Sequence, residues 1–283
     1  YTLRGGAFFR DMFERSGWAE LYGDAADTEQ LLEMGGGNVG AVVEDEVLRF
    51  EILDVVSDGQ FAMVSVRCTL LDEGLKEELE TSYETDLIRF QDVSITDENG
   101  NGPTAYGVRF DFPGKREDLG PYQYGLIFSF SNSGTPLSGR YTIVLKGLAA
   151  NGEKSDGALL STDAWTLEAM LPVTDAEAYE LDLPCTIDGQ PGVLERLSLS
   201  PLALGMEFRL PEDAGGEAYR IFSETVIHLR SGGAIDHGGY SCGVSGGGGS
   251  ARVMLEFQMP LDLDQVESIQ VCGEEILLDD LRG

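Results

Sequence analysis

The sequence predicts an all-β fold, with a minor helical part at the N-terminus, arranged as two consecutive antiparallel β-sandwich domains. Short segments that alternate apolar and polar side chains recur along the chain, as half-buried strands do. Turn residues separate these segments, and few helices that could serve as parallel crossovers lie between them. The pattern restarts near residues 171–176, and a chain of 283 residues suits two domains.

Residues 1–40 differ from the rest of the chain. Four apolar side chains recur there at helical spacing and predict a short amphipathic helix: Phe8, Phe9, Met12 and Phe13. Asp27 followed by Gln30 resembles a capping box that opens a second short helix through Met34. A membrane or partner contact would also use an apolar cluster, but we expect this segment to pack on the first sandwich.

The first sandwich is predicted to span residues 41–173. Its expected strands are Val47–Val56, Phe61–Leu71, Leu87–Thr96, Thr104–Phe112, Tyr122–Ser131, Arg140–Leu148 and Asp163–Leu171. The turn residues 57–60 join the first two strands into a hairpin. Cys68 lies on the apolar face of its strand, which predicts a buried, inert thiol. Residues 74–80 are compatible with a short helix.

The second sandwich is predicted to span residues 174–283. Its expected strands are Ala178–Ile187, Leu194–Ser200, Leu202–Leu210, Tyr219–Arg230, Ala251–Met259, Ser268–Val271 and Glu275–Leu278. The glycine-rich residues 232–250 are predicted to form a long mobile hairpin loop. About seven short strands in series, with turns between them, are typical of immunoglobulin-like sandwiches, and we expect that type in each half.

The charge of the chain limits its partners. Asp and Glu outnumber Lys and Arg by 50 to 19, and the formal net charge is −31. A nucleic-acid binder needs a basic face, so we expect no nucleic-acid partner, and anionic lipid surfaces are disfavoured for the same reason. Solubility accounts for an acidic surface, and a cationic partner or multivalent cations are the alternative. No run approaches the roughly 18 apolar residues that a membrane helix needs.

One segment resembles a calcium-binding loop. Asp97–Gly102 matches the opening D-x-N-x-N-G of that motif, which requires a bidentate Glu at its twelfth position. Val108 stands at that position, and Pro103 follows the segment directly. We therefore predict a solvated hairpin loop rather than a metal site.

Catalytic machinery is not recognisable in the sequence. His237 precedes Cys242 by a few residues, and a Cys–His pair can activate a thiolate, but the surrounding glycines would not hold the two groups in register. His228, the second histidine, lies between apolar residues of a predicted strand, and we expect a structural role for it. We predict no catalytic, cofactor-binding or metal-binding residues, no cofactor, and a protein that is not an enzyme.

The four cysteines contain no CxxC pair, so a zinc site of the usual spacing is not expected. Strand alternation places Cys272 on the face opposite Ile269 and Val271, which predicts that it lies outside the main core. It could pair with Cys185 or with Cys242. Spacing does not choose among the pairings of these three cysteines.

Parts of both halves resemble one protein family. Glu195–Phe208 has the form of a strand, a Ser-Pro turn and a second strand; Val226–Leu229, the glycine-rich loop and Phe257–Ile269 follow it. Together they resemble the extracytoplasmic regions of Gram-positive bacterial membrane-anchored proteins that are related to anti-sigma-factor and sigma-regulator proteins of unknown function. Val47–Leu71 is similar to the first strand pair of their membrane-proximal domain.

The resemblance implies a cellular context. Members of that family typically have a short cytoplasmic segment, one transmembrane helix and β-sandwich domains outside the membrane. It therefore implies an extracytoplasmic location and a membrane anchor upstream of Tyr1, which this chain does not contain. We expect a non-enzymatic sensory or interaction domain that binds an envelope component or a protein partner. The alternative is a cell-surface module for adhesion that binds carbohydrate or cations.

Overall fold

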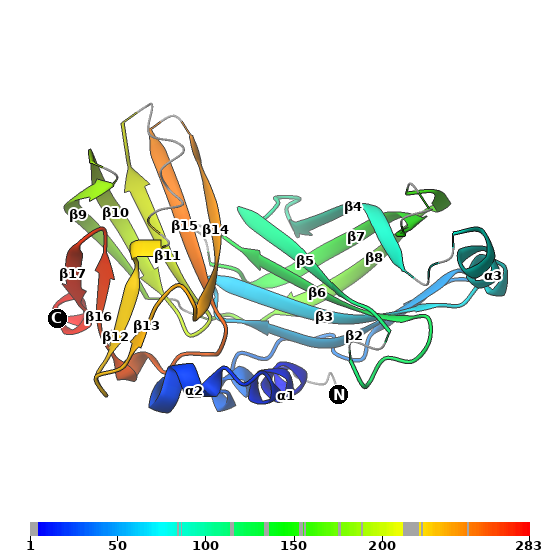
Figure 1. Cartoon of the computed structure of the whole chain (residues 1–283), viewed down its shortest axis with the longest axis horizontal. Helices are drawn as coiled ribbons and strands as arrows, with labels where there is room; N and C mark the ends of the chain where they lie inside the picture. The colour runs from blue at the N-terminus through cyan, green and yellow to red at the C-terminus, as the bar shows by residue number, and fades with distance from the viewer. Residues whose placement is uncertain are drawn as a thin grey trace.

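The computed structural model describes residues 5–83, 85, 87–113, 116–132, 136–152, 155, 157–174, 177–187, 189–211, 221, 223–247 and 249–283. Along residues 240–242 and 244–247 it describes the backbone alone. The predicted all-β, antiparallel fold is confirmed: most residues form strands, and the strands build four antiparallel sheets (Figure 1). The immunoglobulin-like type remains a prediction.

The first sandwich consists of a five-stranded and a three-stranded sheet. The larger sheet contains, in spatial order, β1 (Val42–Glu44), β2 (Leu48–Ser57), β3 (Phe61–Leu70), β6 (Gln123–Ser131) and β5 (Ala105–Asp111). The smaller contains β4 (Ile88–Asp97), β7 (Gly139–Ala150) and β8 (Leu159–Leu171). The predicted β2–β3 hairpin is confirmed, and Phe50 of β2 pairs with the buried Cys68 of β3.

Aromatic side chains fill the space between these two sheets. The ring of Phe50 lies 6.0 Å from that of Trp165 in β8, and the ring of Phe130 lies 5.2 Å from that of Tyr141 in β7. All four rings are buried and bring large apolar areas into one core. The helix α3 (Glu73–Ser82) begins where the Asp72 carboxylate accepts a hydrogen bond from the backbone N–H of Leu75, and it covers the far end of this sandwich.

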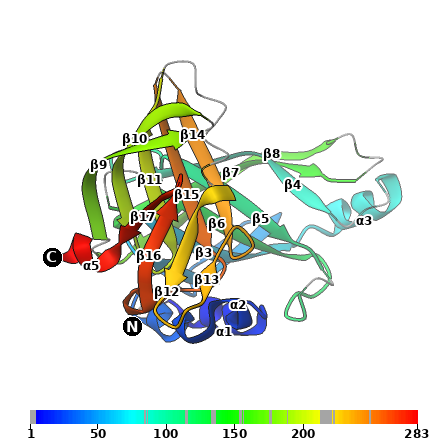
Figure 2. The same cartoon turned by 60° about the vertical axis from the view of Figure 1, so that its left-hand side comes forward.

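The second sandwich pairs a five-stranded with a four-stranded sheet. The larger contains β14 (Tyr240–Gly247), β15 (Ser250–Phe257), β11 (Ala203–Arg209), β10 (Gln190–Leu199) and β9 (Glu177–Ile187). The smaller contains β13 (Ala234–Ile235), β12 (Val226–Leu229), β16 (Val266–Val271) and β17 (Glu274–Leu277). The chain ends in a short helix, α5 (Leu278–Arg282), beside β16 and β17 (Figure 2).

The N-terminal segment runs along both sandwiches. It comprises α1 (Ala7–Arg15), α2 (Ala19–Tyr22) and the 3-10 turns η1 (Gly23–Ala25) and η2 (Glu29–Leu32); a third such turn, η3 (Leu263–Gln265), precedes β16. Figure 1 shows α1 and α2 beneath both sandwiches. The two predicted helical stretches are present, the second as a 3-10 turn. The segment contacts the first sandwich as expected, yet Phe9, Phe13 and Tyr22 belong to an apolar cluster made largely of residues after 184.

Two predicted loops have different structures. The Asp97–Gly102 loop is not a hairpin, because β4 before it and β5 after it belong to different sheets, so it carries the chain from one sheet to the other. The glycine-rich residues are not a long loop either. They include β13 and β14, and β14 pairs with β15 from Tyr240 opposite Phe257 to Gly247 opposite Ser250. Backbone pairing needs no side chain, so glycines can take part in it.

Two further expectations were wrong in detail. The strand predicted over Tyr219–Arg230 is confined to β12. Before β12 the structure describes Ile221, which is helical and fully buried. Cys272 lies in the core, with 8% of its surface exposed. Its φ of 52° is left-handed, so the backbone leaves the strand conformation there and the alternation that placed it on the opposite face no longer applies.

Candidate functional site

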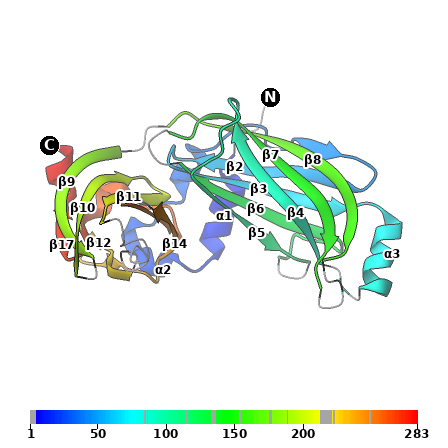
Figure 3. The same ribbon diagram turned by 90° about the horizontal axis from the view of Figure 1, so that it is seen from above.

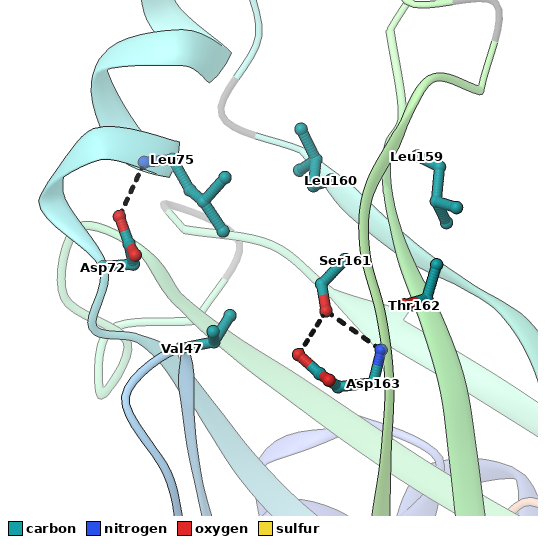
Figure 4. A pocket seen from close by; sticks show the side chains of 8 residues that line it. All are labelled: Val47, Asp72, Leu75, Leu159, Leu160, Ser161, Thr162 and Asp163. Carbon is teal, nitrogen blue, oxygen red and sulfur yellow. Dashed lines mark hydrogen bonds between the residues drawn. The ribbon is translucent and has the colours of Figure 1, made fainter.

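A shallow depression of about 410 Å³ opens at the α3 end of the first sandwich (Figure 4). Its walls are Val47, Asp72, Leu75 and the residues from Leu159 to Asp163. Its carboxylates already have partners: Asp72 caps α3, and Asp163 accepts a 2.5 Å hydrogen bond from the Ser161 hydroxyl. These groups stabilise local backbone and do not converge on a common point (Figure 4).

The carboxylate of Asp97 shapes a turn. One of its oxygens accepts hydrogen bonds from the backbone N–H groups of Asn99, at 2.9 Å, and Asn101, at 2.8 Å. These bonds favour the ionised form and lower the pKa of Asp97. Among the residues that the structure describes, no group of three His, Cys, Asp or Glu side chains is placed to hold a metal ion.

The two histidines and the two tryptophans lie in different surroundings. His237 is exposed in the turn between β13 and β14, while the side chain of Cys242 lies outside the described residues. The imidazole of His228 lies 3.4 Å from the Gln270 side chain within the smaller sheet. Trp165 is buried and donates to Asp45 at 2.7 Å, whereas Trp18 is partly exposed on the N-terminal segment. The two tryptophans therefore do not form one stacking platform.

A buried carboxylate, Asp58, joins the two sandwiches. It lies in the β2–β3 turn and accepts hydrogen bonds from the backbone N–H groups of Gln60 at 3.0 Å and Phe61 at 2.8 Å. Its second oxygen accepts from the N–H of Leu202, in the β10–β11 turn of the second sandwich, at 2.9 Å. Burial removes water from the carboxylate and raises the pKa of Asp58, against the effect of these hydrogen bonds.

A second buried carboxylate, Asp54, holds the N-terminal helix. It follows a bulge in β2 and accepts hydrogen bonds from the N–H groups of Gly6 and Phe9 at the start of α1. Burial raises the pKa of Asp54 as well. A helix N-terminus has free N–H donors and a positive dipole end, so a carboxylate supplied by a strand can cap α1. The sequence signal was an Asp inside the apolar stretch from Ile52 to Val56.

Tyr22 ties the same segment to the second sandwich. Its side chain is fully buried. Its hydroxyl donates to the carbonyl of Gly239 and accepts from the N–H of Gln258 at 3.0 Å. Gly239 immediately precedes β14 and Gln258 immediately follows β15, so Tyr22 fixes one end of this strand pair. Sequence reasoning missed Tyr22, because nothing in the local pattern indicates a partner more than 200 residues away.

The outer edge of β14, which is the edge that is not paired with β15, differs from the other sheet edges. In the described part of the chain the edge strands are β1, β4, β5, β8, β9, β13, β14 and β17. Each of those longer than two residues contains charged side chains, except β14, whose sequence Tyr-Ser-Cys-Gly-Val-Ser-Gly-Gly has neither a charge nor a proline. Charges and prolines protect edge strands against pairing with another chain. The strand β14 lies on the side of the second sandwich that faces the first (Figures 1 and 3).

Comparisons with known proteins identify a fold and no family. No family model matches the chain, and no curated protein sequence resembles it significantly. A crystal structure described as that of the conserved domain protein from Bacillus anthracis is similar, with a TM-score of 0.55 and 14% sequence identity. The similarity covers 88% of this chain and 78% of that one. The overall arrangement of strands therefore also occurs in a solved protein.

Proposed function

We propose that this chain is a non-enzymatic interaction domain that binds a protein partner by adding an extended segment of that partner to the outer edge of β14. The observation that carries the proposal is an eight-residue edge strand that lacks the charges found on the other long edges. An unprotected edge presents unpaired backbone N–H and C=O groups to a second chain. The backbone supplies affinity in such complexes, and the flanking side chains supply specificity.

The charge of the chain supports a basic partner. A net charge of −31 attracts cationic segments and repels acidic ones. The affinity should therefore fall as salt is added, because salt screens exposed charges beyond about 10 Å at 0.1 M. The resemblance to extracytoplasmic regions of membrane-anchored regulators supports a partner from the cell envelope. No helix in the described part of the chain is long and apolar enough to cross a membrane.

Photo-crosslinking tests the binding edge. A photoreactive amino acid replaces Ser245 in β14 or, as the matched control, Thr186 in β9, the opposite edge of the same sheet. Each purified chain is irradiated with envelope extract, and the adducts are identified by mass spectrometry. We expect one protein to be crosslinked from position 245 and not from 186. Equal crosslinking from both positions would contradict the proposal.

A pair of proline variants tests the mode of binding with the partner so identified. Neighbouring N–H groups in a strand point to opposite sides, so of Val244→Pro and Ser245→Pro one removes an outward N–H and the other removes a bond to β15. We expect the variant that loses an outward N–H to abolish binding with little loss of stability. The variant that loses a bond to β15 should have lower stability. Undiminished binding by both folded variants would rule out strand addition.

A further inference from the structure

Two buried cysteines of the second sandwich lie at neighbouring edges of its two sheets. Cys185 belongs to β9, an edge of the five-stranded sheet, and Cys272 lies in the turn that leads into β17, an edge of the four-stranded sheet. Figures 1 and 3 show β9 and β17 side by side. Both side chains are almost fully buried, with 7% and 8% of their surfaces exposed, and they belong to the same apolar core.

Several observations place the two cysteines in the same part of the core. The two thiols are close enough for each to shift the pKa of the other. Glu274, the first residue of β17, is close enough to act electrostatically on Cys185. Gly192 lies opposite Cys185 in β10, and a Cβ at that glycine would come within 3.4 Å of the Cys185 sulfur. The left-handed backbone at Cys272 turns its side chain into the core beside Val271.

We propose that Cys185 and Cys272 are a disulfide-forming pair that links the two sheets of the second sandwich when the protein meets an oxidant of the disulfide class. The Cys185 thiolate attacks one sulfur of the oxidant, forms a mixed disulfide and releases one thiolate. Cys272, once deprotonated, attacks the Cys185 sulfur and releases the second thiolate. Two protein thiols are oxidised, the oxidant's disulfide is reduced to two thiols, and the two protons pass to those products.

The surroundings of the two thiols differ. Burial raises the pKa of Cys185, and a backbone hydrogen bond from Leu194 and the nearby Cys272 offset part of that effect. Burial, the nearby Cys185 and the charge of Glu224 raise the pKa of Cys272 to about 12. We therefore assign the first attack to Cys185. The bond would close a long loop of chain from 185 to 272, the arrangement in which a disulfide most restricts the unfolded state.

Oxidation of the folded, reduced wild-type chain tests the pair. The chain is incubated with oxidised glutathione without denaturant, and its free thiols are then counted in denaturant and its peptides mapped by mass spectrometry. We expect two of the four thiols to disappear, one peptide pair to join Cys185 with Cys272, and the melting temperature to rise by roughly 5–10 °C.

Single alanine variants provide the controls. Cys68→Ala and Cys242→Ala should still lose two thiols and gain melting temperature, whereas Cys185→Ala and Cys272→Ala should do neither. Four persistent thiols in the folded wild-type chain, or a peptide pair that contains Cys242, would overturn the proposal. The wild-type measurements decide this even if an alanine variant fails to fold.

Discussion

At the scale of single residues, two buried carboxylates distinguish this molecule from a set of apolar sheets. Asp54 and Asp58 lie four residues apart, in β2 and just after it, and both are almost fully buried. Both accept hydrogen bonds from backbone N–H groups, and Asp58 also interacts with the Ser200 side chain. A buried carboxylate stabilises a fold only while its oxygens and the N–H groups that donate to them stay hydrogen-bonded. A buried polar group that loses its partner has given up its bonds to water and gained nothing in return. These two residues should therefore be sensitive to substitution.

Replacement of Asp58 tests its contribution. Asp58→Ala leaves the N–H groups of Gln60, Phe61 and Leu202 without their acceptor, and we expect the free energy of unfolding to fall by about 3 kcal/mol. Urea denaturation measures it. Asp97→Ala is the matched control, because Asp97 makes similar turn hydrogen bonds at the surface, where water replaces them, and its effect should be clearly smaller. Equal losses would show that the link to Leu202 contributes nothing.

The pH dependence of stability follows from the raised pKa of Asp58. Between its unfolded and folded pKa values the folded state holds the proton that the unfolded state has lost, so stability falls as pH rises through that window. Asp58→Asn cannot ionise and lacks this decrease. The unfolding free energy of the wild type minus that of Asp58→Asn should therefore be larger at pH 4 than at pH 7. A constant difference would contradict the raised pKa.

At the scale of elements, α1 depends on a capping residue from another element. Gly6 precedes the helix and supplies no side chain, so the Asp54 carboxylate takes that role. Asp54→Ala should lower the unfolding free energy by about 2 kcal/mol and increase amide hydrogen exchange across α1. Asp72→Ala removes the local cap of α3 and should cost about 1 kcal/mol. Exchange in α1 that is unchanged by Asp54→Ala would rule out the capping role.

At the scale of the whole molecule, the N-terminal segment connects the sandwiches. Val56, Phe61 and Ile127 of the first sandwich share one apolar cluster with Tyr22 and with the core of the second. The N–H of Gly36 donates to the carbonyl of Val55 at 2.7 Å, and the N–H of Asp262 donates to that of Ala25 at 2.8 Å. The sandwiches should therefore unfold together.

Tyr22→Phe tests this coupling. The variant removes the hydroxyl's hydrogen bonds with the Gly239 carbonyl and the Gln258 N–H, which keep only the 3.2 Å bond that they make with each other, and we expect a loss of about 1 kcal/mol. In a Trp18→Phe background Trp165 reports on the first sandwich alone, and its fluorescence transition should shift together with the far-UV circular dichroism transition. Leu21→Ala, an exposed change on the same helix, should leave both in place. A Trp165 transition that does not move would mean independent unfolding.

The sequence by itself determined the β class, most of the strands, the β2–β3 hairpin and the buried state of Cys68. Alternation of apolar side chains is a local property, because each strand must direct its apolar face to a core whatever its partners are. The same reasoning recognised neither β14, whose glycines have no side chains to alternate, nor the inward turn of Cys272, whose backbone leaves the strand conformation. These are departures from the local rule.

Only the tertiary structure decided which segments meet. It assigned β4 and β5 to different sheets, brought Asp58 to Leu202 and Tyr22 to Gly239, and placed Cys185 and Cys272 in one apolar core. Such contacts join residues separated by up to about 220 positions, and local spacing carries no record of them. They arise because burying the whole apolar surface together selects one arrangement of the sheets, and each buried polar group must then find its partner within that arrangement.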